Sequence, residues 1–146
     1  MKAENYTKIE FPSSSSNESF ARAAAACFAA KMDPTLDELN DIKTAVSEAV
    51  TNTIIHGYPN RLGKVVMRLS IKEKDVLEIV VRDWGVGIPD VEKARQPMYT
   101  TGNEERSGMG FTIMESFMDT LRVRSAPGRG TVVTMKKRII RRGGRL

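Results

Sequence analysis

The sequence predicts an α/β (α+β) two-layer sandwich, in which a mixed, mainly antiparallel sheet is covered on one face by helices. One strongly amphipathic helix is predicted within residues 33–59, and two β-hairpins are predicted over residues 64–83 and 121–138. The predicted strands and helices do not alternate strictly along the chain. This order disfavours a parallel, doubly wound fold.

The size and composition are those of one globular domain. The chain has 146 residues and a mass of 16.2 kDa, with 40% hydrophobic and 28% charged residues. A chain of this length buries about two thirds of the surface that its unfolded form exposes. We therefore expect a single domain over residues 1–138, followed by a basic C-terminal tail over residues 139–146.

Neither a membrane segment nor a secretory signal is expected. The apolar runs are much shorter than the ~20 residues that span a bilayer, and the N-terminus has no apolar core. The one cysteine, Cys27, cannot form an internal disulfide, and we expect it to be a small buried side chain on a helix rather than a nucleophile. These features favour a reducing cytoplasm.

The basic charge is concentrated near the C-terminus. The net charge is +5 and the isoelectric point is about 9.5, with much of the excess in KKRIIRRGGRL at residues 136–146. A basic tail is a weaker sign of nucleic-acid binding than a basic groove, and no nucleic-acid motif accompanies it. We expect a solvated tail, or one that steers acidic partners, and no direct contact with nucleic acid.

Local signals delimit the longest helix. Asp33 before Pro34 predicts a cap and first turn, Thr35 with Glu38 predicts a capping box, and Gly57 marks the end. Its apolar side chains recur every three or four residues and predict one core-facing stripe. The stripe consists of Leu36, Leu39, Ile42, Val46, Ala49, Val50, Thr53 and Ile54.

A polar ridge is predicted along one border of this stripe. Glu48, Asn52 and His56 follow one another at intervals of four residues. Because such a step drifts by only about 40° around an α-helix, these three side chains are expected to line up beside the core, where a groove could lie.

The remaining elements follow from alternation and turn residues. A first strand is expected near residues 6–11, and an Ala-rich helix, capped by a Ser or an Asn, over residues 20–32. A short helix over residues 90–96 leads into an irregular segment. Helical periodicity then resumes over residues 108–121, with Leu121 as its last apolar position.

Two glycine-containing segments could contact a ligand. RDWGVGIPD places Asp83 at the end of a strand, directly before Gly85 and Gly87, where glycine permits close approach of a ligand. ERSGMGFTIME places Gly108 and Gly110 at the start of a helix, whose free N–H groups attract phosphate oxygens. Each segment alone is also typical of an ordinary turn or cap.

The order of the motifs is more specific than any one of them. A carboxylate and an amide on a helix precede Asp-x-Gly-x-Gly after a strand, Gly-x-Gly before a helix and Gly-Thr before a strand. This order resembles the N, G1 and G2 boxes of the ATP-binding superfamily of gyrase, the heat-shock chaperone of that fold and sensor histidine kinases, with its Bergerat-type ATP-binding fold. More closely, NESFAR, DELNDIKTAVSEAVTNTIIHGY, ARQP and ERSGMGFTIMESFMD resemble the anti-sigma F factors of spore-forming bacteria, which are serine protein kinases.

The resemblance implies roles for residues around a bound ATP or ADP. Asn52 is the implied ligand of Mg²⁺, whose other ligands are phosphates and waters, and Glu48 is the implied base for the attacking hydroxyl. Asp83, assisted by Thr131, is implied to read the exocyclic amine of adenine. His56 is expected to support the helix end. From the residues alone, a solvated Glu or Asn on a helix is the simpler interpretation.

The resemblance also implies a lid that folds over the nucleotide, from Met98 to Ser107. Gly102 could be its hinge, and Arg106 could act in catalysis by placing a cation beside the γ-phosphate. A surface ion pair of Arg106 with Glu104 or Glu105 is the alternative. Further implied nucleotide contacts are Gly85, Gly87, Ser107, Gly108, Met109 and Gly110.

The implied function is regulation of transcription during sporulation. By resemblance, the chain forms a homodimer, sequesters the sigma-F factor, and is released by an anti-anti-sigma factor that it phosphorylates on a serine. Phe20 and Arg22 are candidate partner contacts, although Phe20 could equally be a core residue and Arg22 a solvated one. A non-catalytic switch between ATP and ADP, a histidine kinase fragment and a nucleic-acid binder are the alternatives.

Overall fold

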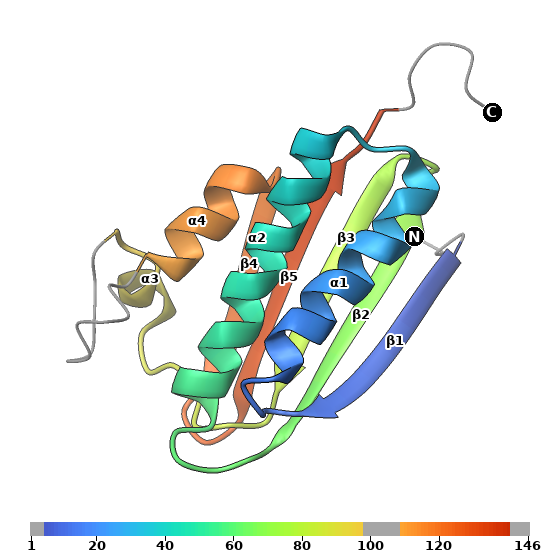
Figure 1. Cartoon of the computed structure of the whole chain (residues 1–146). Coiled ribbons are helices and arrows are strands. Elements are labelled where there is room, and N and C mark those ends of the chain that lie inside the picture. The colour runs from blue at the N-terminus through green and yellow to red at the C-terminus, as the bar shows by residue number, and fades with distance from the viewer. Residues whose placement is uncertain (1–4, 98–108, 141–146) are drawn as a thin grey trace.

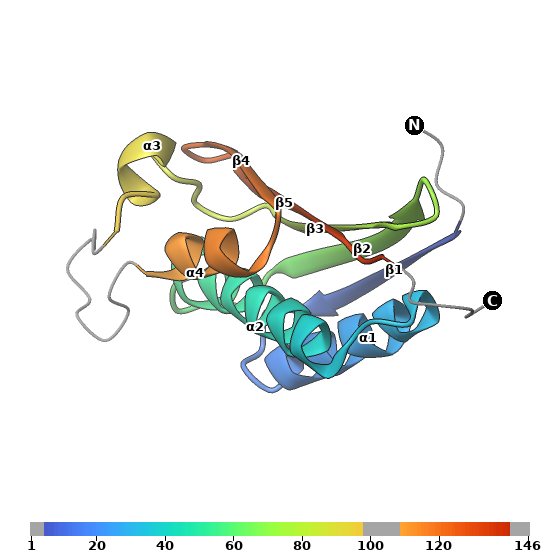
Figure 2. The same ribbon diagram turned by 90° about the horizontal axis from the view of Figure 1, so that it is seen from above.

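The computed structural model describes residues 5–97 and 109–140 and shows a sheet with a layer of helices on one side (Figures 1 and 2). In chain order the elements are β1 (Asn5–Pro12), α1 (Asn17–Ala29), η1 (Ala30–Met32), α2 (Leu36–Asn52), η2 (Thr53–Gly57), β2 (Lys64–Lys72), β3 (Val76–Asp83), α3 (Val91–Ala94), α4 (Gly110–Phe117), β4 (Thr120–Ala126) and β5 (Gly130–Arg138). The α/β two-layer prediction is confirmed.

The sheet has five strands in the order β1-β2-β3-β5-β4, and each of its four strand pairings is antiparallel. Both predicted hairpins are present. A mixed sheet was expected, but no parallel pair occurs among the described strands, because β5 returns beside β3 antiparallel to it and brings β4 to the edge.

The core lies between the sheet and three helices. In Figure 1, α2 lies in the middle of the helix layer, with α1 on one side and α4 on the other. Alternate residues of each strand point toward these helices, as expected from the two-residue period of a strand. The largest fully buried side chains include Ile42, Met67, Leu69, Ile79 and Met135.

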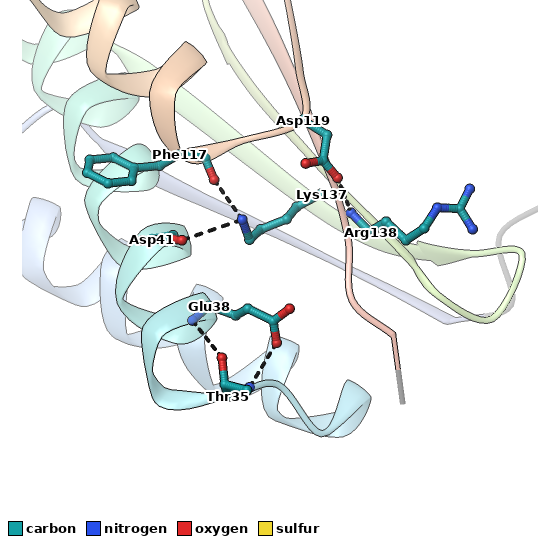
Figure 3. Close-up of polar contacts among 7 residues, drawn as sticks. All are labelled: Thr35, Glu38, Asp41, Phe117, Asp119, Lys137 and Arg138. Atoms are coloured by element: carbon teal, nitrogen blue, oxygen red, sulfur yellow. Dashed lines mark hydrogen bonds and ion pairs between the residues drawn. The ribbon is translucent and has the colours of Figure 1, made fainter. Parts of the chain in front are cut away.

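The start of α2 follows the predicted capping box. Thr35 is the N-cap, its hydroxyl accepts a hydrogen bond from the Glu38 N–H, and the Glu38 carboxylate accepts one from the Thr35 N–H (Figure 3). Asp33 does not cap α2, contrary to expectation. It ends η1 with a left-handed backbone (φ 58°), and the capping position therefore passes to Thr35.

Helix α1 corrects one prediction. Its buried residues are Ala21, Ala25, Phe28 and Ala29, which form a narrow stripe. Cys27 lies outside this stripe and is exposed, so the expected burial of its thiol is wrong. Ser16 is the N-cap residue but makes no side-chain capping bond.

The last helix and the C-terminal boundary also differ from expectation. Helix α4 ends at Phe117, so Leu121 belongs to β4 rather than to the helix. Ile139, assigned to the tail by the sequence, is fully buried, and its N–H donates to the Asp75 carbonyl at 2.7 Å. The packed part of the chain therefore extends at least one residue beyond Arg138. None of the helices in the described ranges is long and apolar enough to cross a membrane.

Lys137 fixes the C-terminal end of α4. Its side chain points to the helix layer, donates to the Phe117 carbonyl at 2.8 Å and lies 3.5 Å from the Asp41 carboxylate of α2 (Figure 3). Nearby, the Asp119 carboxylate accepts a hydrogen bond from the Arg138 N–H at 2.7 Å. A cation at a helix C-terminus also interacts favourably with the helix dipole. Lys137 thus links α4, α2 and β5.

We expect Lys137→Met to lower the free energy of unfolding by about 1 to 2 kcal/mol, because the Phe117 carbonyl and the Asp41 carboxylate lose their shared ammonium partner. Lys136→Met is the matched control, since Lys136 is the neighbouring residue on the opposite, exposed side of β5. Urea unfolding of both variants would measure the difference. Equal effects in the two variants would contradict the assigned role of Lys137.

Candidate functional site

A buried carboxylate lies at the end of β3. The Asp83 side chain is only 3% exposed and is adjacent to Thr131 of β5 in the strand register. Its Oδ1 accepts hydrogen bonds from the N–H groups of Gly85 (2.9 Å) and Thr131 (3.2 Å). Its Oδ2 accepts one from the Thr53 hydroxyl at 3.0 Å. One carboxylate thus joins β3, β5 and the helix end.

Burial raises the pKa of the Asp83 carboxyl above its ordinary value of 3.8, because removal from water disfavours the charged form. The hydrogen bonds from Gly85, Thr53 and Thr131 act in the opposite direction and limit the rise. A buried acid with a perturbed pKa at the end of a strand is a candidate for ligand binding.

Glycines allow the backbone to close around Asp83. A Cβ on Gly85 would lie 1.9 Å from the Gly57 carbonyl oxygen, and a Cβ on Gly57 would lie 2.9 Å from Asp83 Oδ2. Gly87 has a φ of 79°, and a Cβ there would meet the Ala126 carbonyl oxygen at 2.0 Å. Side chains at these positions would therefore force the turn after β3 away from η2 and from the β4–β5 turn.

Thr53 is a site residue that the sequence interpretation missed. It was placed in the apolar stripe of the long helix, and it is buried as expected. Its hydroxyl, however, donates to Asp83. The one polar hydroxyl within an otherwise apolar stripe, directly after Asn52, was the available signal, because a buried hydroxyl needs a partner.

Glu48 and Asn52 face the start of α4. A Cβ on Gly110 would lie 3.1 Å from both the oxygen and the nitrogen of the Asn52 amide, and 3.4 Å from Glu48 Oε1. Helices α2 and α4 therefore meet at these three residues. The carboxylate, the amide and the glycine that the sequence singled out separately are brought together.

His56 lies beyond the end of the α-helix that carries Glu48 and Asn52. The α-helix ends at Asn52, and residues Thr53–Gly57 form the π-helix η2, in which the Tyr58 N–H donates to the Thr53 carbonyl at 3.0 Å. The wider turn interrupts the α-helical spacing before His56, which is exposed. The expected alignment of His56 with Glu48 and Asn52 stays a prediction.

The first turn of α4 has unused hydrogen-bonding capacity. Gly110 is its first residue, Met109 is its N-cap, and the first N–H groups of an α-helix have no partner within the helix. The Thr112 hydroxyl is buried and forms no hydrogen bond with the described residues. These donors, and the small Gly110 beside Asn52, could receive anionic oxygens.

The hydroxyl of Thr131 is directed toward Ser125. Thr131 Oγ1 and Ser125 Oγ are 2.8 Å apart, and Ser125 Oγ also donates to the Gly130 carbonyl at 2.8 Å and accepts from the Ile88 N–H at 2.8 Å. Thr131 therefore contacts Asp83 through its backbone N–H. Ser125 is a further residue of this network that the sequence did not indicate.

Several predicted residues lie elsewhere. Gly102, Arg106, Ser107 and Gly108 lie outside the described residues, as does the rest of the predicted lid from Met98. The candidate partner contacts are on α1, which lies on the opposite side of α2 from α4 (Figure 1). There Phe20 is 53% exposed, and the Arg22 guanidinium lies 3.5 Å from the Glu18 carboxylate.

The described residues contain no group of three or more His, Cys, Asp and Glu side chains that could hold a metal ion. The Asn52 amide oxygen is a suitable ligand for Mg²⁺, which commonly takes one or two protein ligands and completes its octahedron with phosphate oxygens and waters. The Asn52 amide oxygen therefore fits a cation that arrives together with a phosphate ligand. The N–H groups at the start of α4 fit the phosphate oxygens.

Comparisons with known proteins show the family of this chain. A family model described as the histidine kinase-like ATPase domain matches residues 11–137. Anti-sigma F factors of Clostridium kluyveri and Geobacillus kaustophilus are 56% and 57% identical, and each match covers 92% of this chain and 94% or 93% of the relative. The chain belongs to the anti-sigma F factors of the histidine kinase-like ATPase family.

A solved structure supports the fold of this anti-sigma F factor family member. The RsbU and RsbW domains of a Mycobacterium tuberculosis protein match with a TM-score of 0.66 and 19% identity, covering 92% of this chain and 32% of that one. Membership of the family establishes a kinase-like ATPase domain that binds a nucleotide.

We expect Asp83→Asn to weaken ATP binding by about ten- to a hundredfold. Loss of a buried hydrogen bond to a charged group costs about 1.5 to 3 kcal/mol, which corresponds to that range. Calorimetric titration with ATP would measure the change. Unchanged affinity would exclude Asp83 as a nucleotide contact.

The same variant should also change how the stability of the nucleotide-free fold depends on pH. Because the pKa of Asp83 is raised on folding, its protonated form favours folding, and this contribution is lost as pH rises through the folded pKa. The unfolding free energy of Asp83→Asn relative to wild type should therefore increase from about pH 4 to pH 7. Urea unfolding at both pH values tests the sign, and a decrease would contradict it.

Proposed function

We propose that this protein is a serine kinase and an anti-sigma factor, which binds Mg-ATP, sequesters the sigma-F factor and phosphorylates a serine of an anti-anti-sigma factor. The observation that carries the kinase proposal is the meeting of Glu48, Asn52 and Gly110 at the contact between α2 and α4. A base, a cation ligand and an anion-binding helix start are the groups that transfer of a terminal phosphoryl group requires.

Glu48 is the proposed general base. Its carboxylate is only partly buried and lies beside Gly110, at the end of the site where the phosphates are expected. From there it would accept the proton of the serine hydroxyl as the new oxygen–phosphorus bond forms. A protein that only bound nucleotide would not need a carboxylate next to anionic phosphates, because their charges repel.

Asn52 is the proposed protein ligand of Mg²⁺. A neutral amide oxygen adds no negative charge beside the phosphates, and its neighbour Gly110 carries no side chain that would displace a ligand. Bound Mg²⁺ would neutralise the charge that develops during transfer. The N–H groups at the start of α4 would orient the phosphate chain.

Asp83 is the proposed adenine contact. A carboxylate offers about four acceptor positions, and the described residues occupy two on Oδ1 and one on Oδ2. The remaining position on Oδ2 could accept the exocyclic amine of adenine. Guanine presents an oxygen at that place and would be repelled.

The proposed partners follow from the names of the relatives and from α1. Relatives that are 53% to 57% identical are anti-sigma F factors, so a sigma-F factor is the proposed target of this chain. Phe20 and Arg22 are proposed contacts because aromatic and arginine side chains are enriched at interface hot spots, and the Phe20 ring on α1 is 53% exposed. A homodimer in the cytoplasm is the proposed working form.

The proposal is tested by transfer of label from γ-labelled ATP, with Mg²⁺, to the anti-anti-sigma factor of the same organism. We expect Glu48→Gln to reduce transfer by about a hundredfold or more, the contribution of general base catalysis, while ATP still binds. Asp37→Asn is the matched control, because it removes one carboxylate from the exposed first turn of the same helix.

One outcome would contradict the kinase proposal, and a second would contradict the role of Glu48 alone. If wild type binds ATP but labels no acceptor, a non-catalytic switch between ATP- and ADP-bound forms becomes the better account. If Glu48→Gln transfers label at the wild-type rate, the protein is a kinase but Glu48 is not its base.

A further inference from the structure

The face of the sheet that points away from the helices is not covered by any described helix. Helices α1, α2 and α4 lie on the same side of the sheet in Figure 2. The strand residues that alternate with the core positions therefore form a second, open surface. Most of them are exposed or half-buried.

This open surface is strongly basic, and all five strands contribute cations to it. They are Lys8, Lys64, Arg68, Lys72, Arg82, Arg122, Arg124, Lys136 and Arg138. The acidic side chains at outward strand positions in the described ranges are Glu10 and Glu78. The sequence hides this concentration, because the cations come from segments that are far apart in the chain. We call these nine residues the open basic face.

Part of this charge is not neutralised within the molecule. Glu78 lies 2.8 Å from the Lys72 ammonium and 3.9 Å from that of Lys136, and Asp75 lies 2.6 Å from the Arg138 guanidinium. The other strand cations form no ion pair with any described residue. This holds for Lys8, Lys64, Arg68, Arg82, Arg122 and Arg124.

Aromatic rings lie among these cations. The Trp84 ring is 39% exposed, with the Lys64 ammonium 4.5 Å and the Arg82 guanidinium 4.7 Å from its centre. The Tyr6 ring is 58% exposed, and the Arg68 guanidinium lies 4.3 Å from its centre. Half-buried valines occupy the middle of the same face at positions 66, 80 and 132.

We propose that the open basic face binds single-stranded nucleic acid. A sheet face that presents aromatic rings and cations together is suited to single strands, because bases stack on the rings and phosphates meet the cations. Binding exchanges the cation–ring contacts at Trp84 and Tyr6 for base–ring and cation–phosphate contacts. The face of a five-stranded sheet is too wide for the grooves of a duplex, of which the major groove admits an α-helix or a two-stranded ribbon. The inference does not depend on the proposed kinase activity.

The charge disfavours a second copy of the chain as the occupant. Two copies that met through this face would bring guanidinium groups such as Arg82, Arg122 and Arg124 against one another. Like charges placed together across an interface cost several kcal/mol. An acidic protein surface would satisfy the charges but would leave the rings without the flat partners that bases provide.

The test uses the full chain with fluorescein-labelled 20-nucleotide oligo(dT) and oligo(U), followed by anisotropy from 50 to 300 mM salt. Trp84 is the one tryptophan of the chain, so quenching of protein fluorescence reports directly on this face. We expect saturable binding of at least one oligomer, weaker at high salt, with quenching of Trp84. Comparison of the affinities for oligo(dT) and oligo(U) shows whether the open basic face prefers DNA or RNA.

The decisive variant is the triple change Arg82→Gln, Arg122→Gln and Arg124→Gln. It should weaken binding at 100 mM salt by about tenfold or more and reduce the salt slope by about 2, since each lost phosphate contact contributes about 0.7 for a single strand. The matched control removes three cations elsewhere, by Lys31→Gln, Lys43→Gln and Arg61→Gln. Urea unfolding followed by circular dichroism checks that both variants are folded, and this control does not depend on the proposed kinase activity.

Three outcomes would overturn the proposal. The first is that wild type binds neither oligomer at 100 mM salt. The second is that the two triple variants lose affinity equally, which would show an effect of net charge alone. Alternatively, the oligomers do not bind, but the open-face triple variant changes the oligomeric state or releases an acidic protein partner. In that case the face is a protein interface.

Discussion

The proposed nucleotide end of this molecule depends on the burial of one carboxylate. Asp83 is almost fully enclosed, and a buried charge is tolerated only when hydrogen bonds replace its water. Its three partners come from η2, from the turn after β3 and from β5. These elements must therefore keep their relative positions, and Gly57 and Gly85 are needed because any side chain there would separate them.

Helix α4 is held at both ends by different interactions. At its C-terminal end Lys137 binds the last carbonyl and Asp41 (Figure 3). At its N-terminal end Gly110 packs against Asn52 and Glu48 of α2. The position of the start of α4 relative to the Glu48 carboxylate and the Asn52 amide is thus set by the packing of α4 on α2.

The two faces of the sheet have different chemical character. The inward face is apolar and packs against α1, α2 and α4, and it ends in Asp83 and Thr131 at the candidate nucleotide site. The outward face is basic and partly aromatic. A two-layer fold leaves one face of its sheet to solvent or to a partner. The same five strands can therefore build one site at their end and present another surface along their length.

The sequence by itself determined the features that depend on neighbouring residues. These include the capping box of Thr35 and Glu38, the two hairpins, the apolar stripe of α2 and the presence of Asp83 at a strand end. The resemblance to anti-sigma F factors, which the comparisons confirm, also rested on local motifs. The tertiary structure alone decided which polar groups meet. It ended the α-helix before His56 in a π-helix, joined Thr53 to Asp83, exposed Cys27, buried Ile139 and gathered cations from five strands. Such contacts join residues far apart in the chain, and local periodicity carries no information about them.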